Sequence, residues 1–210
     1  MRIYTIQRIE LYEDLLHNGI AYCDRESKMC CDYRFQYDWM AGQMRKRIGR
    51  PIFEGIKYPL WVWQQYSSRK KTKPPMSPHD IPFRQEEAVM LELDVPEDQV
   101  LLSDFALWGL PLLNWGIYGK REDKQLCKEC DEYEKIHGKC NQMADYPESI
   151  RFKIVESWEQ IFNFDIRDPY IVTSRRQNRC IQGTIWYLRK EWLKTAHVFN
   201  RHSEIKRIEY

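Results

Sequence analysis

Apolar residues recur along this chain with the period of strands in some stretches and of helices in others. In residues 88–96 apolar and polar positions alternate, which predicts a strand with one buried face. Residues 7–20, 35–48 and 147–161 place apolar residues three and four positions apart, which predicts amphipathic helices. The pattern also predicts strands at residues 2–6, 169–174, 180–188 and 196–199, and a return strand or turn at 99–105.

This order of elements predicts a single α+β domain over residues 1–210, with a central, mostly antiparallel sheet flanked by helices. The first strand and residues 181–188 should share one region of the sheet, because their apolar residues need mutual burial. In the helix at 147–161, Ile154 and Trp158 should be buried. The predicted apolar side of the helix at 35–48 consists of Phe35, Trp39, Met40, Met44 and Ile48.

A polar insertion at residues 119–145 interrupts this pattern and contains the clearest chemical signal in the chain. Cys127 and Cys130 have the spacing with which two thiolates bind one metal ion from a single turn. The further ligands of a tetrahedral zinc site would be Cys140 with either His137 or the distant Cys180. The alternative is a solvated hairpin or helix with incidental thiols. A zinc ion here would stabilise the insertion and would not be catalytic.

The composition describes a chain that can fold but says little about its partner. With 43% hydrophobic and 14% aromatic residues, the chain can bury a core. Its net charge of +2 gives no overall preference for nucleic acid or membranes. No run of eighteen apolar residues occurs, so no membrane-spanning helix is predicted. The seven cysteines, an odd number, and a charged start without a signal-peptide pattern predict reduced thiols and a cytoplasmic protein.

Two basic clusters flank the aromatic, strand-like residues 58–66. Their members are Arg45, Lys46, Arg47 and Arg50 on one side and Arg69, Lys70, Lys71 and Lys73 on the other. Basic residues beside exposed aromatic rings suit a single-stranded nucleic acid or a phosphate-bearing ligand. The alternative is a solvated helix end followed by a basic loop, since charge runs are commonly solvated surface.

Six stretches, spread in order along the chain, carry a family resemblance. They are RIYTIQ, YDWMAGQMRKRIG, YPLWVWQQY, VMLELDVPEDQVLLSDFALW, ESWEQIFNF and IQGTIWYLRKEWL. Together they resemble a family of bacterial and phage proteins carried as a domain of unknown function, and they cover nearly the whole chain apart from the cysteine-bearing insertion. The family has no assigned activity, so this resemblance implies a relationship and not a function.

A second resemblance concerns the two ends of the predicted sheet. The first strand ends in Thr5 and Gln7, a helix ending in a glycine follows, and a late strand reads Gln182-Gly183-Thr184. This arrangement is similar to ADP-ribosyltransferase-like proteins that act on nucleic acids, and it implies a nucleotide-binding cleft for NAD. The resemblance places Gln182 and Thr184 at the catalytic strand, where those proteins have Gln-Ala-Glu. Thr184 carries no charge to stabilise an oxocarbenium-like centre, which implies a nucleotide-binding relative or a modified mechanism.

The same resemblance implies a set of cofactor-binding residues. They are Thr5, Gln7, Tyr37, Arg45, Arg47 and Asp104. The two arginines would pair with a pyrophosphate through bidentate contacts, and Tyr37 would stack on an adenine or nicotinamide ring. Each group also has a structural alternative. Thr5 or Gln7 would cap the following helix, Tyr37 would pack in the core, and Asp104 would be the N-cap of a helix at 105–110.

Two classes of function fit these patterns. One is a nucleotide-handling protein with an NAD-like ligand, enzymatic or degenerate. The other is a non-enzymatic binding protein that acts on a nucleic acid or protein partner in conflict between bacteria and phages. The chain contains no G-x-S-x-G, P-loop, G-x-G-x-x-G or H-E-x-x-H motif. The Cys30-Cys31 pair is interpreted as a buried or semi-exposed thiol pair, and Cys23, seven residues earlier, leaves thiolate chemistry as a second possibility. The sequence gives no indication of the oligomeric state.

Overall fold

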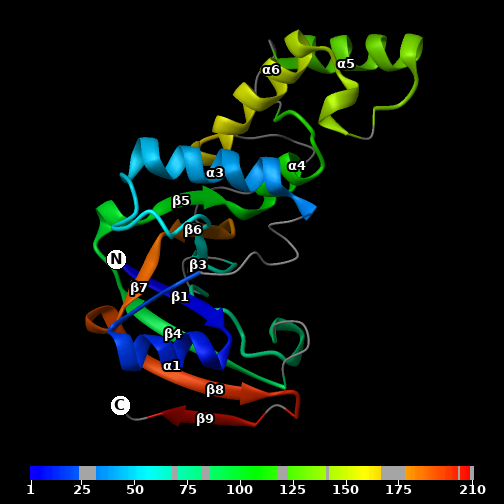
Figure 1. The fold of residues 1–210 in the computed structure, drawn as a ribbon. Helices are drawn as coiled ribbons and strands as arrows, with labels where there is room; N and C mark the ends of the chain where they lie inside the picture. Colours follow the sequence, from blue (N-terminus) through cyan, green and yellow to red (C-terminus); the bar gives the residue numbers. More distant parts are fainter. Residues whose placement is uncertain are drawn as a thin grey trace. The chain divides into compact units, whose positions relative to one another are not determined.

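In the computed structural model, a large antiparallel sheet and five α-helices make up the described part of the chain (Figure 1). The structure describes residues 1–23, 32–67, 71–81, 86–117, 123–140, 142–166, 178–202 and 204–208. The predicted α+β class with a central antiparallel sheet is confirmed. The strand predicted at residues 169–174 lies outside the described residues.

The elements follow one another in mixed order along the chain. The strands are β1 (Arg2–Gln7), β2 (Ile20–Tyr22), β3 (Leu60–Gln65), β4 (Glu87–Asp94), β5 (Leu101–Asp104), β6 (Ile181–Ile185), β7 (Tyr187–Arg189), β8 (Leu193–Asn200) and β9 (Ile205–Ile208). The α-helices are α1 (Ile9–Asn18), α3 (Arg34–Arg47), α4 (Phe105–Leu112), α5 (Asp123–His137) and α6 (Glu148–Ser157). Short 3-10 helices include η1 (Pro78–Asp80), η2 (Glu97–Gln99) and η4 (Trp158–Phe162).

Strand β1 lies in the middle of the seven-stranded sheet, whose order is β5-β6-β3-β1-β4-β8-β9. It pairs antiparallel with β3, where Tyr4 lies opposite Trp63, and with β4 along its whole length. Residues 181–185 of the predicted late strand form β6 in the same sheet, so the prediction is confirmed for that part of 181–188. Strand β7 pairs instead with β2 in a two-stranded sheet. Within the described ranges, the helices are too short or too polar to cross a membrane.

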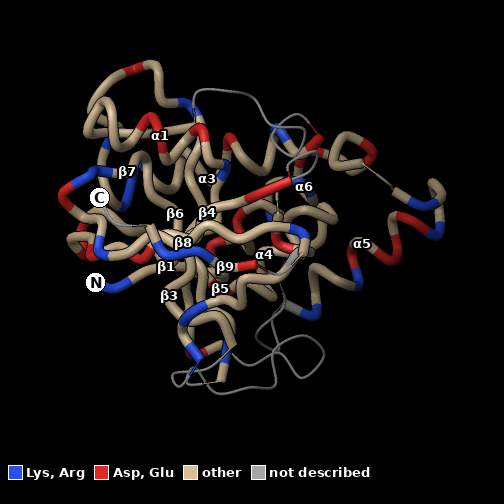
Figure 2. Tube along the Cα trace, turned by 90° about the horizontal axis from the view of Figure 1, so that it is seen from below, with Lys and Arg blue, Asp and Glu red and all other residues tan. Residues whose placement is uncertain are grey.

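The chain divides into two compact units, each with buried residues of its own. The sheet unit comprises Met1–Leu102 and Ile181–Tyr210, and the helical unit comprises Ser103–Cys180. In the helical unit, Ile154 and Trp158 are buried as predicted, with exposed fractions of 1% and 0%. Most of the predicted insertion falls in α5 of this unit. Of the hairpin and the helix that the sequence allowed for a solvated segment, the structure forms the helix. Figure 2 shows acidic and basic residues interspersed along α5.

Helix α3 forms where the sequence predicts it, and two residues of its predicted apolar side, Met40 and Met44, are buried. Its buried residues are Gln36, Tyr37, Met40, Ala41 and Met44. Phe35, predicted on the apolar side, is half exposed. Tyr37 instead packs edge-on against the rings of Tyr58 and Trp61, whose centroids lie 6.4 and 6.2 Å away. Aromatic contacts within the sheet unit therefore set the orientation of a helix that is polar over much of its surface.

Candidate ligand-binding site

The end of β1, the start of β3 and helix α3 surround a pocket in the sheet unit. Its volume is about 330 Å³, and its lining includes Thr5, Gln7, Tyr37, Trp61, Trp63 and Asp80. Pockets that hold small molecules begin at about this volume and combine aromatic walls with a few polar groups. Three of the predicted ligand-binding residues, Thr5, Gln7 and Tyr37, therefore meet at one site.

A short chain of hydrogen bonds holds the polar side of the pocket. The side-chain N–H of Gln7 donates to Thr5 Oγ1 at 2.7 Å, and Thr5 Oγ1 donates to the Trp61 carbonyl at 2.8 Å. The side-chain carbonyl of Gln7 makes no hydrogen bond to another described residue. Neither side chain caps the next helix, because the N-cap of α1 is Arg8 and has no side-chain cap. Thr5 thus orients Gln7, and Gln7 keeps hydrogen-bonding capacity for a ligand.

The other walls of the pocket are aromatic and acidic. Trp61 and Tyr37 pack edge to face, and Trp63 makes a similar contact with Tyr66, with ring centroids 5.1 Å apart. Asp80 is held by its backbone N–H, which donates to the Ser77 carbonyl at 2.9 Å. Its carboxylate makes no hydrogen bond or ion pair with a described residue.

Sequence reasoning did not single out Asp80 or the individual tryptophans as site residues. The two tryptophans were visible as part of the aromatic stretch at 58–66, which alternates as a strand and offers two faces. Asp80 lies in a short turn after a proline-rich segment, where no periodicity or motif marks it. Cys23, which the sequence offered only as a second possibility for thiolate chemistry, also lines the pocket. Only the path of the chain brings these groups to β1.

The two predicted pyrophosphate-binding arginines do not line this pocket. The guanidinium of Arg45 lies over the ring of Trp186, 5.7 Å from its centroid. Arg47 donates from Nε to Gln43 Oε1 at 3.1 Å, one turn back on α3. Both side chains are therefore engaged elsewhere in the sheet unit, and the structure does not bring them to the residues that the sequence grouped with them.

The two predicted catalytic residues lie inside the sheet on β6. Gln182 is 4% exposed and Thr184 is 0% exposed, and neither lines the pocket. Their cross-strand partners on β3 are Trp63 and Trp61, so each shares a face of the sheet with one of the pocket tryptophans. Thr184 Oγ1 donates to the Leu101 carbonyl at 3.5 Å. The side-chain nitrogen of Gln182 is buried without a hydrogen-bond partner among the described residues.

Close packing explains why a glycine, Gly183, lies between these two residues. A Cβ atom at Gly183 would lie 2.9 Å from Val100 Cγ1, 3.1 Å from Val62 Cγ2 and 3.3 Å from Leu102 Cδ2. Real Cβ atoms do not approach other carbon atoms so closely, and crowding of this kind destabilises a well-packed core. Gly183 therefore occupies a position where this sheet leaves no room for a Cβ atom.

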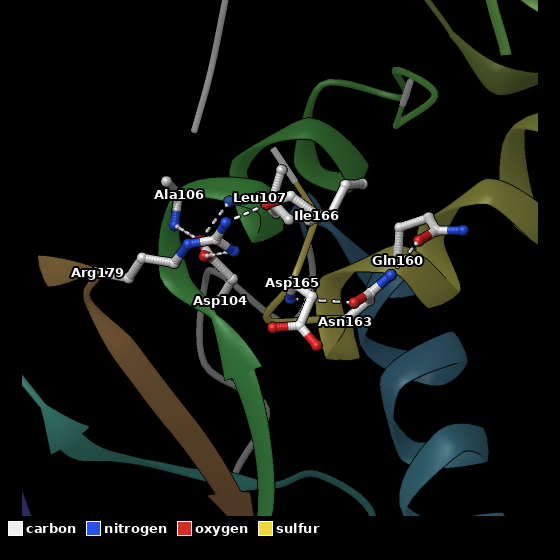
Figure 3. Close-up of polar contacts among 8 residues, drawn as sticks. All are labelled: Asp104, Ala106, Leu107, Gln160, Asn163, Asp165, Ile166 and Arg179. Atoms are coloured by element: carbon white, nitrogen blue, oxygen red, sulfur yellow. Dashed lines mark hydrogen bonds and ion pairs between the residues drawn. The ribbon is translucent and has the colours of Figure 1, made fainter. Parts of the chain in front are cut away.

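Asp104 is an internal group of the helical unit (Figure 3). Its Oδ1 accepts hydrogen bonds from the backbone N–H groups of Ala106 at 2.9 Å and Leu107 at 3.1 Å. Its Oδ2 pairs with Arg179 at 3.2 Å, and Arg179 also donates to the Ile166 carbonyl. Both charged side chains are nearly inaccessible, at 1% and 2% exposed. The N-cap prediction for Asp104 is confirmed, and both of its oxygens serve the fold.

The predicted zinc ligands are spread along α5 and the turn that follows it. Cys127 and Cys130 lie one helical turn apart, and the ring of His137 stacks on Tyr133 with centroids 4.3 Å apart. After the helix, the backbone N–H of Cys140 donates to a carboxylate oxygen of Glu134 at 3.4 Å. Over the described ranges, no three side chains of the metal-ligating types come together to hold an ion.

The protonation of these thiols bears on the same prediction. Burial, and then the charge of Asp131, raises the pKa of Cys127. Burial, followed by the charges of Glu134 and Asp145, raises the pKa of Cys140. Both groups are therefore thiols at neutral pH when no metal is bound, and a zinc ion would bind them by displacing their protons. Zinc stays a prediction, which metal analysis of protein purified without a metal-binding tag would test. Less than about a tenth of an equivalent, with the three cysteines freely alkylated, would reject it.

These features describe an α+β protein with an antiparallel sheet and a small aromatic pocket at its central strands. The chain belongs to the family described as Domain of unknown function (DUF3841), whose model matches residues 2–194. The six stretches that carry the family resemblance all fall within this range, and the predicted membership of a domain of unknown function is confirmed. Comparisons with curated proteins and with solved structures give no match, so a relationship to ADP-ribosyltransferase-like proteins is not shown.

Proposed function

We propose that this protein binds a nucleoside-like ligand by its planar heteroaromatic ring in the pocket of the sheet unit. The observation that carries the proposal is the meeting of Gln7, Tyr37, Trp61, Trp63 and Asp80 around one pocket. Aromatic rings offer stacking surfaces to a flat ligand, and polar groups at the rim select its hydrogen-bonding pattern.

The carboxamide of Gln7 favours a ligand with adjacent donor and acceptor atoms. Because Thr5 holds one of its N–H groups, the orientation of the amide is set and its carbonyl is left to accept a hydrogen bond. Adenine presents a matching donor and acceptor edge to glutamine, and the carboxamide of nicotinamide offers the same pair. The carboxylate of Asp80 suits the hydroxyl groups of a ribose or an exocyclic amine, both of which are donors.

The volume favours a nucleoside-sized ligand over a whole dinucleotide. About 330 Å³ lies at the low end of small-molecule pockets. Arg45 and Arg47, the groups suited to a pyrophosphate, do not line the pocket. Gln182 and Thr184 are also absent from its lining, so the proposal is ligand binding and not group transfer.

Calorimetric titration with adenosine, nicotinamide and NAD tests this proposal. We expect at least one of them to bind, and Gln7→Ala to weaken that binding about five- to hundredfold, as loss of a two-bond amide contact does. Asp80→Asn should also weaken it. The matched control is Asp98→Asn, an exposed carboxylate in η2 outside the pocket, which should leave the affinity unchanged. Absence of binding by all three ligands, or equal losses in the two aspartate variants, would overturn the proposal.

We also propose that the protein works in the cytoplasm. None of the described cysteines, Cys23, Cys127, Cys130, Cys140 and Cys180, is in a disulfide bond. Reduced cysteines in this number suit a reducing compartment, because oxidising compartments convert accessible thiols to disulfides. Alkylation during lysis of cells that make the protein should label these residues without prior reduction. Labelling that appears only after reduction would contradict the cytoplasmic assignment.

A further inference from the structure

A second polar group lies in the sheet unit, on residues that do not line the pocket. His197 of β8 is directly opposite Arg207 of β9. Their side chains therefore leave the same face of the sheet, with Cβ atoms about 5 Å apart. On the other side of β8, His197 lies opposite Met90 of β4. Met76 packs against the buried cluster that contains Met90, so the segment that contains Met76 approaches this face.

Lys73 belongs to that segment and brings a second positive charge to His197. Burial, and then the charges of Lys73 and Arg207, lowers the pKa of His197, so its ring is neutral at pH 7. Neither Lys73 nor Arg207 forms an ion pair with any residue that the structure describes. The nearby carboxylate of Glu92 is engaged, since it pairs with Arg2 at 3.2 Å and accepts from Thr195 at 3.4 Å.

The imidazole of His197 is itself incompletely bonded. Its Nδ1 atom is buried and has no hydrogen-bond partner among the described residues. A buried polar atom without a partner is uncommon in a native protein and costs free energy unless a bound group satisfies it. Lys73 and Arg207, which pair with no described residue, lie beside this ring, so a ligand of this region should be negatively charged and rich in acceptor atoms.

We propose that Lys73, His197 and Arg207 form a site for a phosphate group. The guanidinium of Arg207 offers paired donors that match two phosphate oxygens, and Lys73 adds a compact positive charge. His197 adds one N–H donor when neutral and two when the bound anion favours its protonated form. The phosphate belongs either to a free small molecule or to the backbone of a nucleic acid strand. None of these three residues lines the pocket proposed above.

Aromatic side chains near Lys73 favour a nucleic acid strand as the source of the phosphate. The backbone N–H of Tyr66 donates to the Thr72 carbonyl at 3.0 Å, which holds the residue before Lys73 against the end of β3. Tyr66 and Trp63 are both half-buried and lie edge to face. Rings beside basic side chains are the combination with which proteins hold single strands, by stacking bases and pairing with phosphates.

Titration with inorganic phosphate, followed by phosphorus NMR or calorimetry against chloride at equal ionic strength, tests the site itself. We expect phosphate to bind, and Lys73→Gln and Arg207→Gln each to weaken it about tenfold, as loss of a charge-assisted contact does. The matched control is Lys206→Gln. It removes the same charge one residue away, but Lys206 lies opposite Val198 and so points to the other face of the sheet. This control should change the affinity less than about twofold.

Titration with a single DNA strand of twelve thymidines distinguishes the two sources of the phosphate. If the source is a nucleic acid, the strand binds. In Lys73→Gln and in Arg207→Gln, the slope of log affinity against log salt concentration should then fall by about one, which corresponds to one phosphate contact. If the source is a small molecule, inorganic phosphate binds and the strand does not. In either case the pKa of His197, measured by proton NMR, should rise when phosphate binds, because the anion favours the protonated ring. The charged groups of the protein around this ring are Lys73, Arg207 and Glu92. Failure of both probes to bind, or equal losses in Lys206→Gln and Arg207→Gln, would overturn the site.

Discussion

Two pairs of polar side chains at strand ends, one in each unit, illustrate how similar sequence signals take different roles. In the sheet unit, Thr5 and Gln7 lie at the end of β1 and line a pocket. In the helical unit, Asp104 ends β5 and pairs with Arg179. The sequence marked Thr5, Gln7 and Asp104 alike as candidate ligand-binding residues. The difference is that both oxygens of Asp104 are bonded internally, whereas the side-chain carbonyl of Gln7 is not.

This comparison separates residues that stabilise the fold from residues available to a ligand. A buried ion pair loses much of its attraction to desolvation, so its presence alone does not make a protein more stable. Removing one partner is costly, however, because it leaves an uncompensated charge inside. The polar pair on β1 should show the reverse behaviour, with a small effect on stability and a large effect on binding.

The largest stability effect is expected from Asp104→Ala. The change leaves Arg179 buried without its partner and removes the N-cap of α4, which should lower the free energy of unfolding by about 3–5 kcal/mol. Urea unfolding measures the loss. The control is Ser103→Ala at the neighbouring position, where the hydroxyl is buried without a partner among the described residues. Equal losses in the two variants would break the comparison, because the charge pair would then have no special role.

A comparable loss is expected from Trp158→Ala, also in the helical unit. Trp158 is fully buried and its ring N–H donates to the Trp115 carbonyl at 2.8 Å. Truncation of a buried tryptophan costs about 3–5 kcal/mol through lost burial and the cavity that remains. Trp115→Ala is the control, because that side chain is 59% exposed and its backbone carbonyl is unaffected. A thermal midpoint for Trp158→Ala as high as that of the control would contradict this account.

In the sheet unit, Gly183→Ala should destabilise the protein, but by less than the two changes above. Its control, Gly42→Ala, should stabilise the protein. Crowding against Val100, Val62 and Leu102 should lower stability by about 1–3 kcal/mol. Gly42 lies inside α3 with no atom within 4 Å of a Cβ at that position. Gly42→Ala should therefore raise stability by up to about 1 kcal/mol. Denaturation of both variants checks the pair, and a neutral Gly183→Ala would show that the sheet can relax there.

The smallest effect concerns pH and His197. Its folded-state pKa is lowered from the ordinary value of 6.5, mainly by burial and then by Lys73 and Arg207. The neutral ring therefore contributes fully above pH 6.5, and the contribution is lost as pH falls through the folded-state pKa. Unfolding measured from neutral to acidic pH should show a shallower decline for His197→Gln than for the unsubstituted protein. His202→Gln, an exposed position, should keep the original decline.

Some of these roles could be read from local sequence. Asp104 precedes an apolar helix at the N-cap position, and Ile154 and Trp158 repeat at helical spacing, so their roles depend on neighbours a few residues away. The alternation in β4 correctly marked Val89, Leu91 and Leu93 as buried, but the predicted polar face was wrong, because Ala88 and Met90 on that face are buried too. Periodicity was less complete for α3, where it identified Met40 and Met44 but placed Phe35 on the buried side in place of Tyr37, which packs against Trp61.

By itself, the sequence determined the α+β class, most of the strands and helices, and the polar residues at the end of β1. Only the tertiary structure decided that Asp80 joins Gln7 at a pocket and that Arg45 lies instead on Trp186. It alone also brings Lys73 to His197. The physical reason is range: caps and periodic faces are set by bonds within a few residues, whereas these groups meet through strand pairing between distant segments, whose partners no local pattern specifies.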